Sequence, residues 1–484
     1  MATIVGRNKE IAELESIYNS DEAQLVAVYG RRRVGKTFLI DEALKGKITF
    51  RHAGLSPVDE NGKKNLLKDQ LKNFYNSLRL HGMPHGKCPT SWLDAFFMLE
   101  QHLQKEDNGT RQVVFLDELP WLDTPRSGFM TAFEAFWNGW GCHRDNLMVI
   151  VCGSANSWIL DNLINNHGGL YGRTKYSIKL KPFSLKESDE FFNTRGILLS
   201  KYDILQSQMI LGGIPYYLGY FKKGYSFAQN IDRLFWSDEA KLKDEFDRLF
   251  SSVFSNPDEM QRIIITLSKR RKGFTRGDLA NTLGVNADGF FTKQLNALMA
   301  SDFIQKYRPF GEAKNDYYKL IDPFCVFYCK FLKGGNNQDP YFWSNNQFSQ
   351  SVVSWRGFAF EDFCFRQVAA IKRALGISGV NTEISAWSLR GNDQNDGSQT
   401  DLVIKRKDNI VNLCEMKFYA EEYSADKEDN RKMLKRVEDL KKELPLKFTI
   451  HPTLVTTFGL KYNEYSGTFQ NVVTIDDFFH DTIV

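Results

Sequence analysis

Eight consecutive residues match the phosphate-binding pattern G-x-x-x-x-G-K-[ST] at every fixed position: Gly30, Arg31, Arg32, Arg33, Val34, Gly35, Lys36 and Thr37. The apolar residues 25–29 before them predict a buried strand, and residues 38–44 after them predict the first turns of a helix. A glycine loop between a strand and a helix aims backbone N–H groups at phosphate. We expect this phosphate loop to bind ATP, with Lys36 reaching the β- and γ-phosphates and the Thr37 hydroxyl ligating Mg²⁺. An ordinary glycine turn beside basic residues is the alternative.

Two further strands are expected to complete that site. The apolar run 113–116 ends in Asp117, which would hold Mg²⁺, and Glu118, which would orient and deprotonate the attacking water. The run 147–154 ends in small polar residues, and Ser154 or Asn156 would sense the γ-phosphate from a neighbouring strand. A simple cap for the helix that begins near Trp158 is the alternative for these two residues.

Length and composition limit the class of protein. A chain of 484 residues suggests roughly three or four domains. Its formal net charge of +4 gives no global signal for a polyanion partner, so any nucleic-acid surface must be local. Seven cysteines without a C-x-x-C pair indicate reduced thiols. A charged N-terminus and the lack of an apolar run near ~20 residues predict a cytoplasmic protein without a membrane partner.

The middle of the chain changes character twice. A helical stretch from 184 to about 250 contains Pro215, a helix breaker that could fix the chain against a bound base or simply make an interhelical turn. From 258 onward, a helix, a helix-turn-helix and a hairpin follow in winged-helix order. The expected recognition helix, 289–299, carries only Lys293 as a cation, so packing against protein is as well supported as DNA binding. The basic run Lys269–Lys272 is the better candidate for phosphate contacts, or else a solvated loop.

The last part of the chain carries a second set of acids. The strands expected at 400–405 and 410–417 bring Asp401 near Glu415 and Lys417, and the last two share a strand face. Such a set suits a metal-dependent phosphodiesterase, in which Asp401 and Glu415 bridge Mg²⁺ or Mn²⁺ and Lys417 holds or deprotonates water. Glu361, on a helix expected at 355–374, would complete the metal ligands. A solvent-facing strand pair with ordinary charges is the alternative.

Several of these segments carry a family resemblance. Residues 5–7 with Glu10, and segments 29–37, 116–120 and 170–173, resemble the archaeal-type P-loop ATPases, which are related to AAA+ proteins and lie near the STAND group. The resemblance implies that Arg7 binds nucleotide, that Pro215 touches adenine from a helical lid, and that Arg173 acts as an arginine finger or sensor unless it forms a structural salt bridge. From about 342 the chain resembles the DUF234 domain, which is similar to the PD-(D/E)xK nuclease fold. Thr400 stands here where that motif has proline.

Together these features predict an α/β fold with five segments. They are an AAA+-like P-loop ATPase core over 1–180, a helical lid over 181–255, a winged helix over 256–330, a linker over 331–350, and a restriction-endonuclease-like domain over 351–484. We expect an Mg²⁺-dependent ATPase whose nucleotide state controls DNA binding and a nuclease-like domain. A non-cleaving, STAND-like switch that binds DNA or protein is the alternative, and a homo-oligomer or a signalling protein is a further possible partner.

Overall fold

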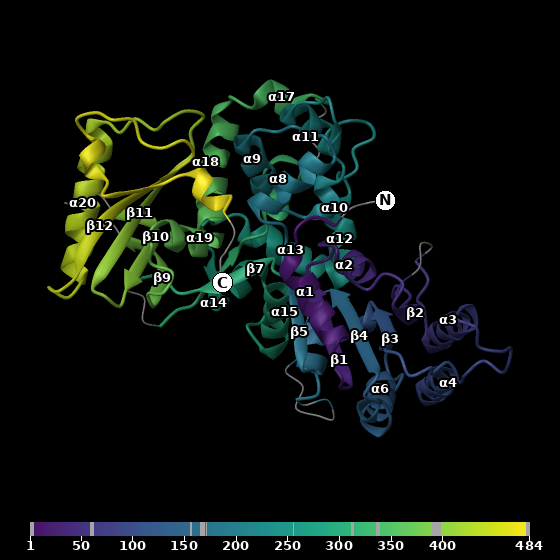
Figure 1. Ribbon diagram of the computed structural model, residues 1–484. Helices are drawn as coiled ribbons and strands as arrows, with labels where there is room; N and C mark the ends of the chain where they lie inside the picture. Colours follow the sequence, from purple (N-terminus) through teal and green to yellow (C-terminus); the bar gives the residue numbers. More distant parts are fainter. Residues whose placement is uncertain are drawn as a thin grey trace. The chain divides into compact units, whose positions relative to one another are not determined.

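The computed structural model describes residues 4–58, 62–154, 157–164, 170, 172–254, 256–310, 314–334, 339–389 and 398–480. The chain forms two compact units (Figure 1). The first unit contains Met1–Pro182, Leu249–Pro257 and Gln294–Asp302, and the second contains Phe183–Arg248, Asp258–Lys293 and Phe303–Val484. No helix in these described ranges is long and apolar enough to cross a membrane.

A five-stranded parallel sheet forms the centre of the first unit, in the order β2-β3-β4-β1-β5. Its strands are β1 (Gln24–Gly30), β2 (Ile48–Ala53), β3 (Gln112–Asp117), β4 (Leu147–Ser154) and β5 (Tyr176–Leu180). Every residue of β3 and β4 is buried, as expected for parallel strands covered on both faces. The strands predicted at 25–29, 113–116 and 147–154 are therefore confirmed.

Helices supply the apolar cover of this sheet. They are α1 (Asn8–Tyr18), α2 (Lys36–Ala43), α3 (Leu67–Leu80), α4 (Trp92–Lys105), α5 (Leu119–Leu122), α6 (Phe129–Gly139) and α7 (Ser157–Ile159), with a 3-10 turn at Gly141–His143 and a π-helical turn at Leu160–Ile164. One face of the sheet packs with α3, α4 and α6 in an aromatic-rich core. Asn8 is the first helical residue of α1, and Arg7 precedes the helix in a left-handed conformation with φ of 61°.

Short helices make up the start of the second unit: α8 (Leu185–Thr194), α9 (Lys201–Leu211), α10 (Pro215–Leu218), α11 (Phe227–Phe235) and α12 (Glu245–Val253), the last of which runs into the first unit. Serines begin three of them, and each hydroxyl accepts the N–H three residues on: Ser184, Ser200 and Ser226. Along α9 all residues from Ile204 to Leu211 are buried, so this helix is the centre of the helical layer.

The next segment has the element order expected from its sequence. It contains α13 (Pro257–Leu267), β6 (Phe274–Thr275), α14 (Arg276–Leu283), α15 (Gly289–Ala300), β7 (Ile304–Tyr307) and β8 (Tyr317–Leu320). The three strands form an antiparallel sheet in the order β6-β8-β7. Thr275 caps α14 by accepting the Asp278 N–H, and Gly284 ends the same helix with φ of 70°.

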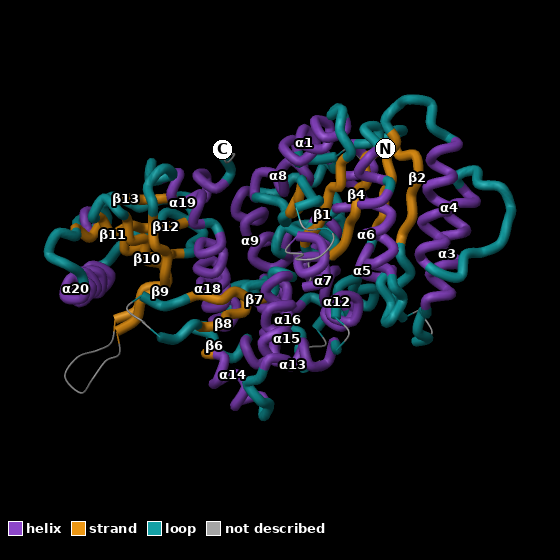
Figure 2. The backbone as a smooth tube through the Cα atoms, turned by 90° about the horizontal axis from the view of Figure 1, so that it is seen from below, coloured by secondary structure: helices purple, strands orange, loops and turns teal. Residues whose placement is uncertain are grey.

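A mixed sheet, in the order β13-β12-β11-β10-β9, organises the end of the second unit. Its elements, with the helices before and between them, are α16 (Pro323–Phe331), α17 (Phe342–Asn346), α18 (Gln350–Arg366), α19 (Val368–Ala374), β9 (Thr382–Leu389), β10 (Ser398–Arg406), β11 (Ile410–Lys417), α20 (Lys427–Glu443), β12 (Thr449–Thr456) and β13 (Asn471–Val473), with 3-10 turns at Ser466–Thr468 and Ile475–Phe478. Helix α20 covers one face of this sheet, and α18 and α19 lie on the other side (Figures 1 and 2).

The predicted strands at 400–405 and 410–417 are confirmed, and they pair antiparallel. The single helix expected over 355–374 is wrong, because Gln367 leaves the helical conformation and divides it into α18 and α19. Residues 390–397, between β9 and β10, lie outside the described part of the chain.

Candidate functional site

The phosphate loop connects β1 to α2 in the first unit. Two of its residues are left-handed, Arg33 with φ of 70° and Gly35 with φ of 91°, and left-handed residues of this kind are typical of anion-binding backbone nests. At the start of the loop Gly30 lies against β5, where a Cβ would stand 2.3 Å from the carbonyl oxygen of Leu180. Only glycine fits at position 30, so the close approach of β5 fixes where the loop begins.

Lys36 is held across this loop. It is the first residue of α2, its side chain is buried, and its Nζ donates to the carbonyl oxygens of Gly30 at 3.3 Å and Arg31 at 3.2 Å. Both acceptors are neutral, so the positive charge of the ammonium stays uncompensated by them. This places a cation beside backbone suited to anions, which is the arrangement expected for phosphate binding.

Thr37 and Asp117 lie together although 80 residues separate them in the sequence. The Thr37 hydroxyl donates to Oδ2 of Asp117 at 2.8 Å, and Oδ1 of Asp117 accepts the Glu118 N–H at 2.9 Å. A hydroxyl and a carboxylate oxygen are ligands that Mg²⁺ prefers. The residues at the tips of β3 and the loop therefore fit this cation.

Glu118 follows directly, in a left-handed conformation with φ of 47°. Burial raises the pKa of its carboxyl above the usual range, and the neighbouring Asp117 charge raises it further. Lys36, Arg32 and the backbone N–H of Ser154 act in the opposite direction by stabilising the carboxylate. A carboxylate with a raised pKa is a stronger base than an ordinary glutamate, as a proton acceptor requires.

Ser154 reaches the same place from β4. It is paired with Gly30 in the parallel ladder, and its N–H faces the Glu118 carboxylate. Contact with a γ-phosphate stays a prediction for Ser154, and Asn156 lies outside the described residues.

Two glycines near Glu118 were missed by the sequence reasoning. A Cβ on Gly54 would stand 2.9 Å from the carbonyl oxygen of Glu118, and one on Gly153 would stand 2.8 Å from Cδ of Pro120. Both close approaches join segments distant in the sequence. No local pattern therefore marked these glycines.

Three nucleotide-site candidates remain: Arg7, Arg173 and Pro215. The buried guanidinium of Arg7 donates to the carbonyl oxygen of Lys181 at 2.8 Å, just beyond β5. Arg173 is exposed in a turn, and within the described ranges its side chain has no ion-pair partner. Pro215 begins α10 in the second unit. Their contacts with nucleotide stay predictions.

The predicted acidic site of the second unit is brought together in part. Glu415 and Lys417 share one face of β11, with Nζ 3.1 Å from Oε1. The second carboxylate oxygen of Glu415 pairs with Arg436 on α20, while Lys417 also lies 3.7 Å from Asp429. Burial acts to lower the pKa of Lys417, but Glu415 and Asp429 outweigh it and raise that pKa. Glu415 is therefore engaged by two cations.

Of the other two predicted residues, only Glu361 has a described side chain, and that side chain is engaged elsewhere. Glu361, on α18, forms an ion pair with Arg271. Helix α18 packs against the face of β11 that carries Cys414, opposite the face of Glu415. For Asp401 only the backbone in β10 is described. Among the side chains that the structure describes, no group of three acidic, histidine or cysteine residues is placed to hold a metal ion.

Comparisons with known proteins agree with the geometry of the phosphate loop. A family model described as an ATPase domain predominantly from Archaea matches residues 4–221. The uncharacterized protein MJECL04 of Methanocaldococcus jannaschii is 26% identical over 335 residues, 68% of this chain and 68% of that protein. The uncharacterized ATP-binding protein MJ0423 of the same organism is 49% identical over 43 residues, 9% of this chain and 73% of that protein.

Solved structures with some similarity were also found. The Walker-type ATPase PABY2304 of Pyrococcus abyssi is 18% identical with a TM-score of 0.48, covering 67% of this chain and 96% of that one. The ORC2 protein of Aeropyrum pernix is 14% identical with a TM-score of 0.44, covering 67% and 92%. It is the family model alone that assigns residues 4–221 of this chain to the ATPase domains found predominantly in Archaea.

Proposed function

We propose that this chain is an Mg²⁺-dependent ATPase whose nucleotide state controls a DNA-binding winged helix and a nuclease-like domain. The observation that carries the ATPase part is the hydrogen bond between Thr37 and Asp117, which joins the phosphate loop to the acidic strand beside Lys36 and Glu118. Genome defence or mobile-element biology, in the cytoplasm, is the proposed setting.

Each residue of the site has a distinct task in this proposal. The loop N–H groups and Lys36 bind the phosphates, and Lys36 offsets charge that develops on the γ-phosphate. Glu118 takes the proton of the attacking water, which its raised pKa favours. Thr37 and Asp117 would hold Mg²⁺, which supplies further charge neutralisation when bound. Steady-state hydrolysis with and without Mg²⁺, in the wild type and in Glu118→Gln, tests this assignment.

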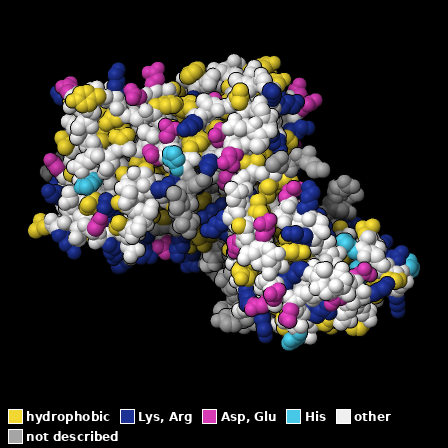
Figure 3. All heavy atoms as spheres, in the orientation of Figure 1, with side chains coloured by type: hydrophobic (Ala, Val, Ile, Leu, Met, Phe, Trp, Pro, Cys, Tyr) yellow, Lys and Arg dark blue, Asp and Glu magenta, His cyan; other side chains and the backbone are white. Residues whose placement is uncertain are grey.

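For the winged helix, we propose DNA contact through the basic run Lys269–Lys272. In the structure three of these cations lie over aromatic rings: Arg270 over Phe274, Arg271 over Phe358 and Lys272 over Tyr317. Such stacking holds a cation in place without neutralising it. Arg271 is in addition paired with Glu361. On the face drawn in Figure 3, acidic and basic side chains are interspersed, so a DNA surface depends on a local cluster of this kind.

Titration of duplex DNA at several salt concentrations tests the DNA proposal. Neutralising Lys269, Arg270, Arg271 and Lys272 together should weaken binding to all sequences alike and flatten the salt dependence, because fewer counterions are released. Neutralising the same number of charges at Lys63, Lys64, Lys68 and Lys72 in the first unit is the matched control. If the two sets of substitutions weaken DNA binding equally, the basic run is not the DNA contact.

For the C-terminal segment the candidates are cleavage by Asp401, Glu415 and Lys417 and a switch that binds DNA or protein without cleaving. The contacts of Glu415 with both Lys417 and Arg436 favour the switch, because paired carboxylate oxygens are less available to a metal ion. An assay for Mg²⁺- or Mn²⁺-dependent cleavage of DNA and RNA, with and without ATP, separates the two. Cleavage that is lost in both Asp401→Ala and Lys417→Ala, with ATP hydrolysis retained, would establish the nuclease.

A further inference from the structure

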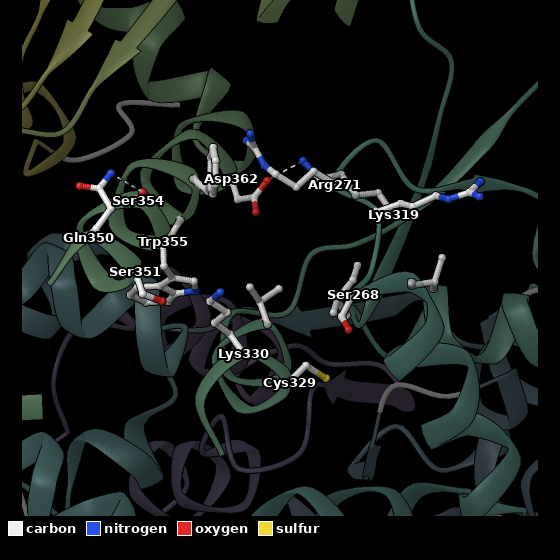
Figure 4. Close-up of a pocket in the computed structure, with 16 residues that line it drawn as sticks. Ser268, Arg271, Lys319, Cys329, Lys330, Gln350, Ser351, Ser354, Trp355 and Asp362 are labelled. Atoms are coloured by element: carbon white, nitrogen blue, oxygen red, sulfur yellow. Dashed lines mark hydrogen bonds and ion pairs between the residues drawn. The ribbon is translucent and has the colours of Figure 1, made fainter. Parts of the chain in front are cut away.

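The residues that line a cavity of about 610 Å³ all belong to the second unit (Figure 4). Its lining comes from the end of α13 with the basic run, from β8, from α16 and from α18. Its volume falls within the roughly 300–1,000 Å³ that small-molecule sites commonly have. The cavity is therefore large enough for a ligand of metabolite size.

Positive charge dominates the lining. Four cations, Arg270, Arg271, Lys319 and Lys330, face a single acidic residue of the lining, Asp362. Two of the cations are anchored. Lys319 pairs with Asp362 (Figure 4), and Arg271 pairs with Glu361, which is outside the lining.

The other two cations, Arg270 and Lys330, have no ion-pair partner anywhere in the described ranges. They come from different elements, the basic run and α16. The cavity therefore offers an anion two uncompensated positive charges, on Arg270 and Lys330, beside the two cations that are already ion-paired. A group with two negative charges would balance Arg270 and Lys330.

Aromatic surface lies next to these charges. Trp355 and Phe358, both on α18, line the cavity together with aliphatic side chains of Leu267, Leu320 and Val326. The Trp355 side chain is buried, and its indole N–H has no hydrogen-bond acceptor among the described atoms. A buried donor without an acceptor is unfavourable, and a ligand with an acceptor atom beside a planar ring would satisfy it.

We propose that this cavity is a binding site for a nucleoside monophosphate, distinct from the ATP site on the phosphate loop. The phosphate would meet Arg270 and Lys330, and the base would lie on the aromatic and aliphatic side of the cavity near Trp355. A purely inorganic anion would leave that apolar half unfilled, and an uncharged nucleoside would leave the cations unbalanced. Since the cavity joins α13 and the basic run to α18, a ligand there would couple those elements.

Calorimetric titration of the full-length Lys36→Ala protein tests the proposal, because that background weakens binding at the phosphate loop. The probes are the four common nucleoside 5′-monophosphates, inorganic phosphate, and adenosine. We expect at least one monophosphate to bind with a Kd below 100 μM, which corresponds to a binding free energy of roughly −5.5 kcal/mol or better. Phosphate and adenosine should each bind at least about tenfold more weakly, because each fills one half of the site.

Single substitutions then locate the ligand. Lys330→Ala should weaken monophosphate binding about tenfold, as loss of a charge-assisted contact predicts, and Trp355→Phe should weaken it about threefold through loss of the N–H donor. Lys333→Ala, two residues after the end of α16 and outside the cavity lining, is the matched control and should leave the Kd within twofold. Thermal unfolding of each variant separates lost binding from lost folding.

Three results would overturn the proposal: no monophosphate binding below 1 mM, equal effects of Lys330→Ala and Lys333→Ala, or tighter binding of a 5′-phosphorylated hexathymidylate than of any monophosphate. The last would assign the cavity to a nucleic-acid strand. Because binding at the phosphate loop is already weakened in the Lys36→Ala background, none of these results depends on whether the chain hydrolyses ATP.

Discussion

Replacing Lys36 with alanine should weaken ATP binding strongly, and the structure sets the size of the effect. A unit charge about 4 Å from a phosphate charge contributes ~4 kcal/mol at an effective dielectric constant near 20. Against this stands the loss of two hydrogen bonds, at 3.2 and 3.3 Å to the carbonyl oxygens of Arg31 and Gly30, that Lys36 already makes without nucleotide. Because these hydrogen bonds are long, we take about 1 kcal/mol as the free energy lost when Lys36 exchanges them for contacts with phosphate. The net loss of about 3 kcal/mol corresponds to roughly a 100-fold increase in the Kd for ATP.

Calorimetry with a slowly hydrolysed ATP analogue measures this Kd directly. The control is Lys45→Ala, which removes an exposed lysine just after the same helix, paired only at 3.7 Å with Glu42. Lys45→Ala should leave the Kd within twofold, because exposed ion pairs contribute little. A Kd for Lys36→Ala within threefold of the wild type would refute the argument that this ammonium is the principal phosphate contact.

Three further predictions concern the proposed base Glu118, the phosphate loop and the contacts of Glu415. Glu118→Gln should keep ATP binding but lower turnover about 10²- to 10⁴-fold. Because burial raises the pKa of Glu118, wild-type turnover should fall at a higher pH on acidification than an ordinary glutamate would give, and a turnover–pH profile without that acid limb would contradict the role. Gly30→Ala should lower the free energy of unfolding by about 2 kcal/mol or more, since its Cβ would meet the Leu180 carbonyl oxygen at 2.3 Å. Gly86→Ala, which meets no atom within 4 Å, should change little in the same urea titration. Arg436→Ala should strengthen Mn²⁺ binding to the C-terminal segment by freeing one oxygen of Glu415, and unchanged calorimetric titrations would show that no metal site is held closed there.

Continuous apolar runs made the first unit the most predictable part of the chain. The strands β1, β3 and β4 follow from unbroken runs of branched and aliphatic residues, and the loop between β1 and α2 follows from its glycines. The joining of Thr37 to Asp117 was also expected, because the carboxyl ends of parallel strands meet at one edge of a sheet.

Contacts between distant segments were the part that the sequence could not supply. The pairing of Glu415 with Arg436 depends on how α20 crosses the sheet, and the pairing of Glu361 with Arg271 depends on packing between segments 90 residues apart. The left-handed conformation of Arg7 runs against the ordinary preference for Asn8 as a cap. In each case tertiary packing decides between local alternatives of similar free energy.

Gly54 shows that a residue without a functional group can govern the chemistry of this protein. The backbone of Glu118 packs directly against Gly54, which follows the end of β2. This contact limits how closely the backbone of the proposed base can approach β2. Any larger residue there would displace the carboxylate while leaving every chemical group of the site present. Enzymes that depend on sub-ångström placement lose rate under such displacement. Sequence variation at position 54 would thus tune ATP turnover from outside the phosphate loop, and relatives with a side chain there would need a compensating shift of the segment that begins with Glu118.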